Sequence, residues 1–520
     1  MIKFTGRYYT HESLIDIIVD RLLNQIDIYS FKKSDIYIID PFSGDGRLIY
    51  HFIKRWYERN YPKMKWNIEL WDIHKEGHIV AKEKINELRE KGLLITCNYR
   101  VVDTFMYQDN YINAFDIVIT NPPWETLKPD ARELKCLSTD EKEKYIESLK
   151  EYDSLLSSKF PESQPIKKFA GWGTNLSRVG LDVSYALVKE NGYCLIILPA
   201  SFFADKQSQK IRTRIFKRNI KEILYLPAEA KLFGKADVDS SILFFSKEIN
   251  RDKSFTLYKF SKDLKILQIN NILYSDVKVE NDDYIIPIGI GIDGLSLLKK
   301  MRMVSMCNSL QDIEELWLGR ELDETQIDLF LHNKEVGIKF IRGRMIERYN
   351  IRPTQFQVYE KNNFKIPSTV LYERIVWRDV SRTSQTRRMI ATIIPSDLIA
   401  GNSLGVCCYK GRNKKVLKIL LGIMNSLCFE FQLRNYLATG HISISAIKKC
   451  FIPPLNEILK NERIYSLVET ILNGNTTVEM KLEAEVAKSI YKLTKKEFNI
   501  LINAFDKISE LEKENILLQY

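Results

Sequence analysis

The stretch Ile36-Tyr37-Ile38-Ile39-Asp40-Pro41-Phe42-Ser43-Gly44-Asp45-Gly46 decides the fold of this chain. Its apolar start is typical of a buried strand, and its second half is a turn with two glycines that opens a helix-like stretch, residues 47–58. Such glycines let the backbone approach a ligand closely, and open α/β sheets bind ligands where their strands end. An acid at the strand end suits a ligand with a positive group, such as an amino acid or a sulfonium. The alternative is a tight turn with a purely structural role.

The alternation of strand and helix continues beyond this turn. The sequence predicts a strand over 67–71, a helix over 79–91, a third strand that ends near Val102 and a fourth over 115–120. This order is typical of a doubly wound α/β sheet. Asp72, which precedes Ile73, ends the second strand and can accept both hydrogens of a ribose diol. Asp103 follows the third strand and can accept from an adenine amino group. Asp72 could instead be a surface residue at a strand end.

The fourth strand is followed by Asn121-Pro122-Pro123-Trp124. Two prolines after a strand make a stiff turn that has no N–H to donate. Such a turn presents the Asn121 side-chain oxygen and the Pro122 carbonyl side by side, and two acceptors match the two hydrogens of an exocyclic amine. Trp124 offers an aromatic face on which a base can stack.

Composition excludes several classes of protein. The chain has 520 residues, of which 45% are hydrophobic and 28% charged, as in soluble globular proteins. The most apolar stretch, residues 193–204, is too short to span a bilayer, and the N-terminus lacks the apolar segment of a signal peptide. We therefore expect a cytoplasmic protein without a membrane partner. No CxxC pair occurs, and His74 and His78 lack an evident third ligand, so no metal site is predicted. The net charge of +11 favours a polyanionic partner.

The sequence predicts four regions. Residues 1–250 form the α/β domain, which is interrupted over 125–180 by a charged insertion of helix and loop. Residues 251–309 form a connecting segment, and residues 310–455 form a basic and aromatic region of mixed α and β structure. Residues 456–520 form a helical tail with apolar residues at helical spacing.

The glycine turn and the Asn-Pro-Pro-Trp turn together resemble the S-adenosylmethionine-dependent amino methyltransferases of DNA. Gly6-Arg7-Tyr8-Tyr9-Thr10 resembles the family segment that lies over the methionine part of the cofactor, and Leu232-Phe233-Gly234 resembles the segment whose aromatic packs against the flipped base. The order of these segments is similar to that of the gamma group of adenine-N6 methyltransferases of type II restriction–modification systems. Ser403-Leu404, Asn425-Ser426-Leu427 and Ile452-Pro453-Pro454 resemble the C-terminal recognition domain of that group. His11 stands where the family often has proline, and the insertion over 125–180 is longer than in the smallest members.

This resemblance implies a Rossmann-like methyltransferase sheet, S-adenosyl-L-methionine as cofactor and a flipped-out adenine in double-stranded DNA as substrate. It implies catalytic roles for Asn121, Pro122, Pro123 and Trp124, and base stacking by Trp124 and Phe233. The cofactor would contact residues from five segments: Tyr9, Thr10, Asp40, Pro41, Gly44, Gly46, Asp72, Ile73, Asp103 and Asn121.

Residues 310–455 would then form the target-recognition domain, since arginines interleaved with aromatic residues can contact phosphates and guanine edges. Each arginine could instead belong to a solvated basic face. The candidate DNA-binding residues are Arg342, Arg344, Arg348, Arg374, Arg378 and Arg382.

Several alternatives compete with adenine methylation. Cytosine-C5 chemistry needs a Pro-Cys nucleophile, and the chain has no such dipeptide. Cytosine-N4 enzymes more often have serine before the two prolines, and RNA or protein-glutamine methylation fits the long basic C-terminal half less well. A non-catalytic specificity subunit would not need Asp40, Gly44, Asp72 and Asn121. Because no nuclease-sized domain precedes Gly6, we expect the cognate restriction endonuclease to be a separate protein.

Overall fold

The computed structural model describes most of the chain, and everything below refers to that part. The described residues are 10–28, 31, 35–129, 134, 137–166, 168, 171–233, 238–278, 283–286, 291–304, 308–322, 331–332, 338–352, 357–359, 366–382, 385–411, 413–437 and 440–520. The chain divides into two compact units, Met1–Ile288 and Gly289–Tyr520.

A nine-stranded sheet forms the centre of the first unit, with the strand order β3-β2-β1-β4-β5-β7-β6-β8-β9. The strands from β3 to β5 run parallel, whereas β7 is antiparallel to both of its neighbours. The strands are β1 (Asp35–Asp40), β2 (Lys65–Asp72), β3 (Leu94–Val101), β4 (Phe115–Thr120), β5 (Val188–Pro199), β6 (Arg218–Leu226), β7 (Ser240–Ile249), β8 (Ser254–Phe260) and β9 (Ile266–Leu273).

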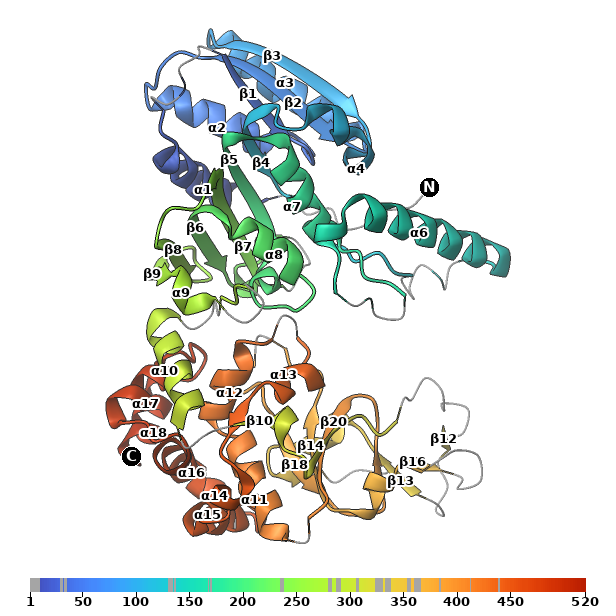
Figure 1. Ribbon diagram of the computed structural model, residues 1–520, viewed down its shortest axis with the longest axis vertical. Coiled ribbons are helices and arrows are strands. Elements are labelled where there is room, and N and C mark those ends of the chain that lie inside the picture. Colours follow the sequence, from blue (N-terminus) through green and yellow to red (C-terminus); the bar gives the residue numbers. More distant parts are fainter. Residues whose placement is uncertain are drawn as a thin grey trace. The chain divides into compact units, whose positions relative to one another are not determined.

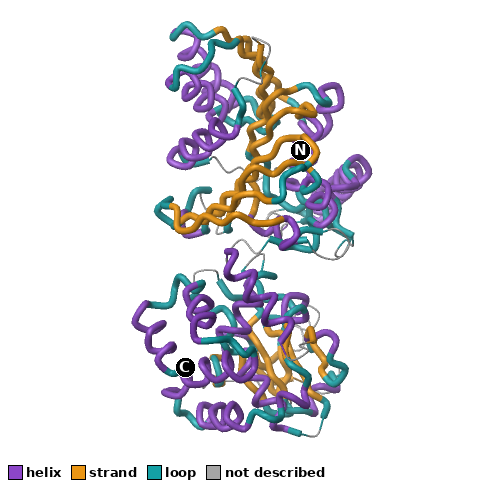
Figure 2. Tube along the Cα trace, turned by 60° about the vertical axis from the view of Figure 1, so that its left-hand side comes forward, coloured by secondary structure: helices purple, strands orange, loops and turns teal. Residues whose placement is uncertain are grey.

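Helices cover both faces of this sheet (Figure 2). Helices α1, α2 and α3 pack next to one another, and α4 packs against α7. The apolar faces of α1 and α2 join β1 and β2 in one buried core that includes Leu22, Phe52 and Ile68. The prediction of a doubly wound α/β sheet is therefore confirmed. The helices are α1 (Glu12–Gln25), α2 (Arg47–Glu58), α3 (Glu76–Glu90), α4 (Thr104–Tyr107), α6 (Thr139–Lys159), α7 (Leu176–Leu187), α8 (Gln209–Ile215) and α9 (Tyr274–Val277).

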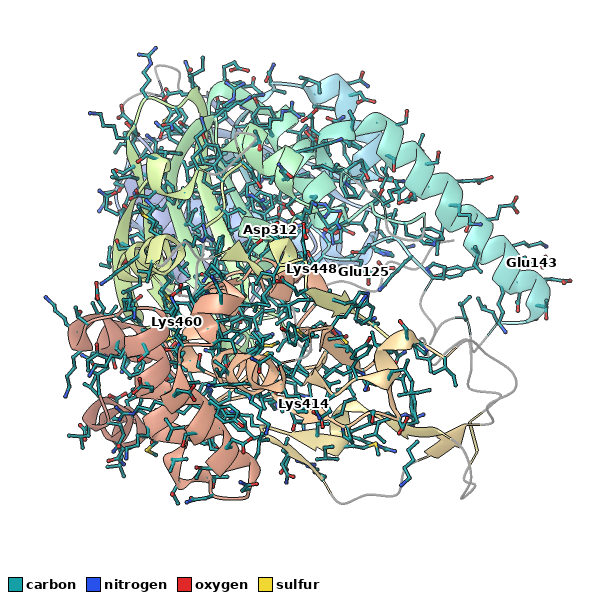
Figure 3. All side chains as sticks on the ribbon, turned by 60° about the horizontal axis from the view of Figure 1, so that its bottom comes forward. Glu125, Glu143, Asp312, Lys414, Lys448 and Lys460 are labelled. Carbon is teal, nitrogen blue, oxygen red and sulfur yellow. The ribbon has the colours of Figure 1, made fainter. Side chains whose placement is uncertain are left out.

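The charged stretch between β4 and α7 contains the long helix α6, which runs away from the sheet in Figure 1. A capping box starts this helix, because the Ser138 side chain accepts from the Glu141 N–H and the Glu141 carboxylate accepts from the Ser138 N–H. Glu143, labelled in Figure 3, lies near the far end of α6 and is exposed. Only the face with Leu149, Asp153 and Leu156 is buried.

The sheet does not end at residue 250. Strand β8 pairs in parallel with β6, and β9 pairs with β8, so both strands extend the sheet beyond β7. The segment 251–309, predicted as a connector, therefore contributes its first part to the sheet, and the first compact unit continues to Ile288. Five of the eight residues of β9 are apolar, yet most of its side chains are exposed.

The second unit contains two four-stranded sheets and two short pairs of strands. One sheet has the order β11 (Leu316–Gly319), β20 (Leu404–Tyr409), β17 (Arg374–Arg378) and β18 (Ala391–Ile394). The other has the order β12 (Leu331–His332), β16 (Gln357–Tyr359), β13 (Ile338–Ile341) and β19 (Leu398–Ala400). The short pairs are β10 (Asn308–Ser309) with β21 (Phe451–Ile452) and β14 (Ile346–Glu347) with β15 (Asn350–Ile351).

The predicted helical tail is present and packs into the same core as the preceding region. Leu420 of α11, Val468 of α15 and Ile516 of α18 belong to one buried cluster, which also includes Trp377 of β17. The helices of this unit are α10 (Gly291–Met303), α11 (Lys414–Met424), α12 (Leu427–Arg434), α13 (Ile444–Lys448), α14 (Leu455–Ile458), α15 (Glu462–Leu472), α16 (Glu479–Glu485), α17 (Lys495–Asn503) and α18 (Glu510–Leu518).

None of the described helices is by itself long and apolar enough to cross a membrane, although α11 and α12, bent by 63° to each other, meet that criterion as a pair.

Candidate active site

A cleft lies where the parallel strands of the first unit end. Because β1, β2, β3 and β4 run in the same direction, their carboxyl ends meet at one edge of the sheet. The cleft has a volume of about 1040 Å³, which includes space open to solvent. The structure brings most of the predicted cofactor and catalytic residues together in its lining, namely Thr10, Asp40, Gly44, Asp72, Ile73, Asp103, Asn121, Pro122 and Pro123.

The glycine turn is tightly packed against the start of α3. Gly44 and Gly46 have φ values of +50° and +69°, a backbone region that side chains rarely tolerate. Gly77, at the start of α3, comes so close that a Cβ atom there would lie 2.1 Å from the Gly44 carbonyl oxygen. The Gly44 N–H donates to Asp72 Oδ2 at 2.9 Å. The ends of β1 and β2 are thereby joined into one wall of the cleft.

Asp40 has its carboxyl group buried beneath this turn, with 1% of the residue exposed. Its Oδ1 atom accepts from the Thr120 hydroxyl at 2.6 Å and from the Phe42 N–H at 3.1 Å. Burial raises the pKa of Asp40 from 3.8 to about 7, although these two hydrogen bonds oppose the shift. Asp40 therefore links β1 to the last residue of β4 and titrates near neutral pH.

The other two strand-end acids are held by hydrogen bonds. Asp72 Oδ1 accepts from the His74 N–H at 2.8 Å. Asp103 caps α4, because its Oδ1 atom accepts from the Phe105 N–H at 3.0 Å, and its Oδ2 atom accepts from the Tyr152 hydroxyl at 2.8 Å. A carboxylate oxygen can accept more than one hydrogen bond, so both acids can still bind a ligand in the cleft.

The Asn-Pro-Pro turn is positioned by contacts on two sides. The Asn121 amide donates to the Thr10 hydroxyl at 3.4 Å. Pro122 packs on α7 at Gly180, where a Cβ atom would lie only 2.4 Å from the proline Cβ. A larger residue at position 180 would displace the turn from the cleft.

Trp124 and Phe233 lie against each other, with ring centroids 4.8 Å apart and planes tilted by 54°. Phe233 is 3% exposed and belongs to the core of the unit. The structure therefore places Phe233 beneath Trp124 as its support. For Phe233 itself to stack on a base, as the sequence predicted for both aromatic residues, the two rings would first have to separate.

Residues 25–233, which include all of the lining of the cleft except Thr10, match the family model of the Eco57I restriction-modification methylase. The match covers about two fifths of the chain.

The fold of the chain is similar to that of the type IIL restriction-modification enzyme MmeI, solved in complex with DNA. The two have 11% sequence identity and a TM-score of 0.60, and the match covers 100% of this chain and 79% of MmeI. The type IIG restriction endonuclease BpuSI matches with 13% identity and a TM-score of 0.41, over 98% of this chain and 65% of BpuSI. A class I S-adenosylmethionine-dependent methyltransferase from Listeria monocytogenes matches with 17% identity and a TM-score of 0.34, over 50% of this chain and 67% of that one. No curated protein is a significant match to the sequence.

The cleft contains residues that sequence reasoning missed. Phe42, Arg47, Phe105, Tyr152 and Leu176 also line it. Arg47 could have been found from its place directly after Gly46, and it donates to the Thr10 carbonyl oxygen at 2.9 Å. No pattern in the sequence indicates Tyr152, which comes from α6 within the insertion.

Some of the predicted site residues do not line the cleft. The Pro41 carbonyl accepts from the Thr104 hydroxyl, and Gly46 packs on Ala81 of α3, 3.0 Å from the position of a Cβ atom. Both support the cleft from behind. Tyr9 lies outside the described residues, and within the described part no group of His, Cys, Asp and Glu side chains could hold a metal ion.

The arginines predicted to bind DNA differ widely in exposure. Arg374 is fully buried, and its guanidinium forms a two-fold ion pair with Glu321, at 2.5 Å and 2.8 Å. Its assignment as a DNA contact is wrong, because its hydrogen-bonding groups face the interior of the second unit. Arg348 pairs with Glu479 at 3.0 Å, and Arg378 donates to the Ile346 carbonyl oxygen at 3.1 Å.

The remaining three candidates are accessible. Arg344 and Arg382 are exposed, and Arg342 is half-buried over the ring of Phe340, with 5.2 Å between the guanidinium carbon and the ring centroid. Three of the predicted arginines are therefore held by partners within the second unit, Arg348 and Arg374 by carboxylates and Arg378 by a backbone carbonyl.

Proposed function

We propose that the chain is a site-specific DNA methyltransferase of a restriction–modification system, which transfers a methyl group from S-adenosylmethionine to N6 of adenine in duplex DNA. The observation that carries this proposal is the shared cleft, in which three strand-end acids and the glycine turn lie beside Asn121-Pro122-Pro123. We also propose that the chain is a member of the gamma group, whose order of segments it resembles.

The cleft offers the polar groups that the cofactor would need. Asp72 and Asp103 present carboxylates, which are the acceptors that a ribose diol and an adenine amino group need. We propose that the amino-acid end and the sulfonium bind beside the Asp40 carboxyl, where Gly44 lines the cleft and lets a ligand approach the backbone closely. When bound, the cofactor supplies an electrophilic methyl group.

The residues of the Asn-Pro-Pro turn would act on the adenine amino group. The lone pair of N6 is delocalised into the ring, which makes it a poor nucleophile. If the Asn121 side-chain oxygen and the Pro122 carbonyl accept the two N–H bonds, the lone pair can turn toward the methyl group. A direct in-line displacement then needs no covalent intermediate and depends on positioning and on preorganised acceptors.

The target base must leave the duplex stack, which costs a few kcal/mol. Trp124, supported from below by Phe233, provides the surface on which the extruded adenine can stack. We propose that the second unit reads the DNA sequence through its exposed arginines and that a separate endonuclease cleaves unmodified DNA. The similar fold of MmeI, whose structure contains DNA, supports a DNA partner.

Nucleoside analysis tests the reaction itself. The purified chain is incubated with S-adenosylmethionine and a mixed-sequence duplex, and the digested DNA is analysed by mass spectrometry. We expect N6-methyladenine. The appearance of N4-methylcytosine would show the alternative reaction, and an unmodified duplex combined with DNA binding would favour a non-catalytic specificity subunit.

The Asn121→Ala variant tests the site. Its single-turnover rate should fall on the order of 100–1000-fold, because one preorganised acceptor is lost, while cofactor affinity should be nearly unchanged. Asn110→Ala, an exposed asparagine of the same domain outside the cleft, should retain the wild-type rate. A wild-type rate in Asn121→Ala would contradict the assignment of this turn as the active site.

A further inference from the structure

Helix α6 contributes a side chain to the cleft although it lies outside the sheet. The helix belongs to the stretch between β4 and α7, and its Tyr152 lines the cleft next to Asp103. The Tyr152 hydroxyl donates to Asp103 Oδ2 at 2.8 Å, across 49 positions of sequence. Burial and the neighbouring Asp103 carboxylate both raise the pKa of Tyr152, so the phenol keeps its proton and acts as the donor.

The C-terminal half of α6 is fixed on both sides of Tyr152. Lys159 donates to Asp109 Oδ2 at 2.6 Å and to the Met106 carbonyl oxygen at 3.3 Å, and both partners follow Asp103 closely in the chain. On the other side, the buried Asp153 carboxylate accepts from the Thr174 N–H at 3.2 Å and from Lys168 at 2.5 Å. The position of Tyr152 is therefore determined by neighbours and does not depend on its bond to Asp103 alone.

The two oxygens of Asp103 are held by different elements. Oδ1 accepts from the Phe105 N–H of α4, and Oδ2 accepts from Tyr152 of α6. A single donor would leave the carboxylate free to rotate about its last bond, whereas two donors on separate oxygens set its plane. Each oxygen keeps a second lone pair for a ligand.

We propose that Tyr152 is a positioning residue that holds the Asp103 carboxylate in the orientation that accepts the amino group of a 6-aminopurine, and so makes the cleft selective for an adenine cofactor. This inference rests on the proposed function. A 6-oxopurine presents an acceptor oxygen in place of the amino group, and two acceptors cannot share a hydrogen. A carboxylate whose plane is fixed discriminates between the two purines more strongly than one that can rotate away from the acceptor oxygen.

Calorimetric titration with two thioethers tests the proposal. S-adenosylhomocysteine carries the 6-amino group, and S-inosylhomocysteine carries oxygen in its place. The wild-type chain should bind the adenosyl compound much more tightly. Tyr152→Phe keeps the ring and removes the hydroxyl, so it should lose about tenfold in affinity for the adenosyl compound and change by less than about twofold for the inosyl compound.

Two controls separate positioning from folding. Tyr145→Phe removes a hydroxyl from the same helix at a residue that does not line the cleft, and it should keep the wild-type ratio of affinities. In an Asp103→Asn background, Tyr152→Phe should not change the ratio further, because the hydroxyl acts through the carboxylate.

Each outcome of these titrations either supports or overturns the positioning role of Tyr152. A selective loss of affinity for the adenosyl compound supports the proposal. An equal loss for both compounds means that Tyr152 only supports the wall of the cleft, and an unchanged ratio means that it has no role in selection; either result overturns the positioning role and leaves the proposed function standing. A wild-type chain that binds neither compound overturns both.

Discussion

Asp40 shows how one side chain can make the stability of the first unit depend on pH. Its pKa is about 7 in the folded chain against 3.8 for an exposed aspartic acid. Between these two values the folded state binds more protons than the unfolded state, so stability falls as the pH rises through this window. Below pH 3.8 both states are protonated and above pH 7 both are ionised, and the contribution of Asp40 is then constant.

We therefore expect Asp40→Asn, which cannot ionise, to remove this dependence. As the pH rises from about 4 to 7, the wild-type chain should lose about 4 kcal/mol of stability relative to the variant. Urea unfolding of both proteins across that range measures the difference. Asp140→Asn, at the exposed start of α6, should behave as the wild type does. A constant difference between the Asp40 variant and the wild type would mean that the carboxyl is ionised throughout.

At the scale of the secondary-structure element, the burial of a strand determines whether an arginine on it faces the interior or the solvent. Arg374 begins β17, four of whose five residues are buried, and it neutralises Glu321, which also accepts from the Thr369 hydroxyl and the Ala400 N–H. Arg374→Met would leave the Glu321 carboxylate unpaired in the interior, at a cost of about 3–5 kcal/mol. Urea unfolding should show this loss.

The Arg344→Ala variant should behave in the opposite way to Arg374→Met. Because Arg344 is exposed, its removal should change stability by less than about 0.5 kcal/mol. It should weaken DNA binding and lower the slope of log affinity against log salt concentration by about 1. DNA titrations at several salt concentrations measure this slope. An Arg374→Met variant with wild-type stability and weakened DNA binding would contradict the burial of this residue.

The elements also show what a sequence can and cannot predict. The strands that end at Asp40, Asp72 and Thr120 were predicted correctly because a short apolar run, a turn and a helix are local signals. Strand β9 was missed although five of its eight residues are apolar; the structure leaves four of these five side chains exposed on the last strand of the sheet. The Tyr152–Asp103 contact and the Arg374–Glu321 pair join residues 49 and 53 positions apart, and only the packing of distant elements brings them together.

At the scale of the whole molecule, the division into two units predicts where the chain can be cut. A fragment of residues 1–288 should fold and bind S-adenosylhomocysteine as the full chain does, but should not select a DNA sequence. Calorimetry and competition between DNA duplexes measure the two properties. A cut at residue 250 is the matched control, because it removes β8 and β9 and exposes β6 as a sheet edge. If the 1–288 fragment methylated the same site selectively, recognition would lie within the first unit.

The shared core of the second unit also sets an order of events during synthesis. Its buried residues run from Leu297 to Ile516, so this unit cannot complete its interior until the ribosome has made almost all of it. At about 5–20 residues per second, translation of such a stretch takes on the order of 10–40 s. The first unit, whose sheet is complete by Leu273, can fold during that interval. The nascent chain therefore carries a finished cleft while the part that follows it is still unfolded and exposes apolar surface to chaperones.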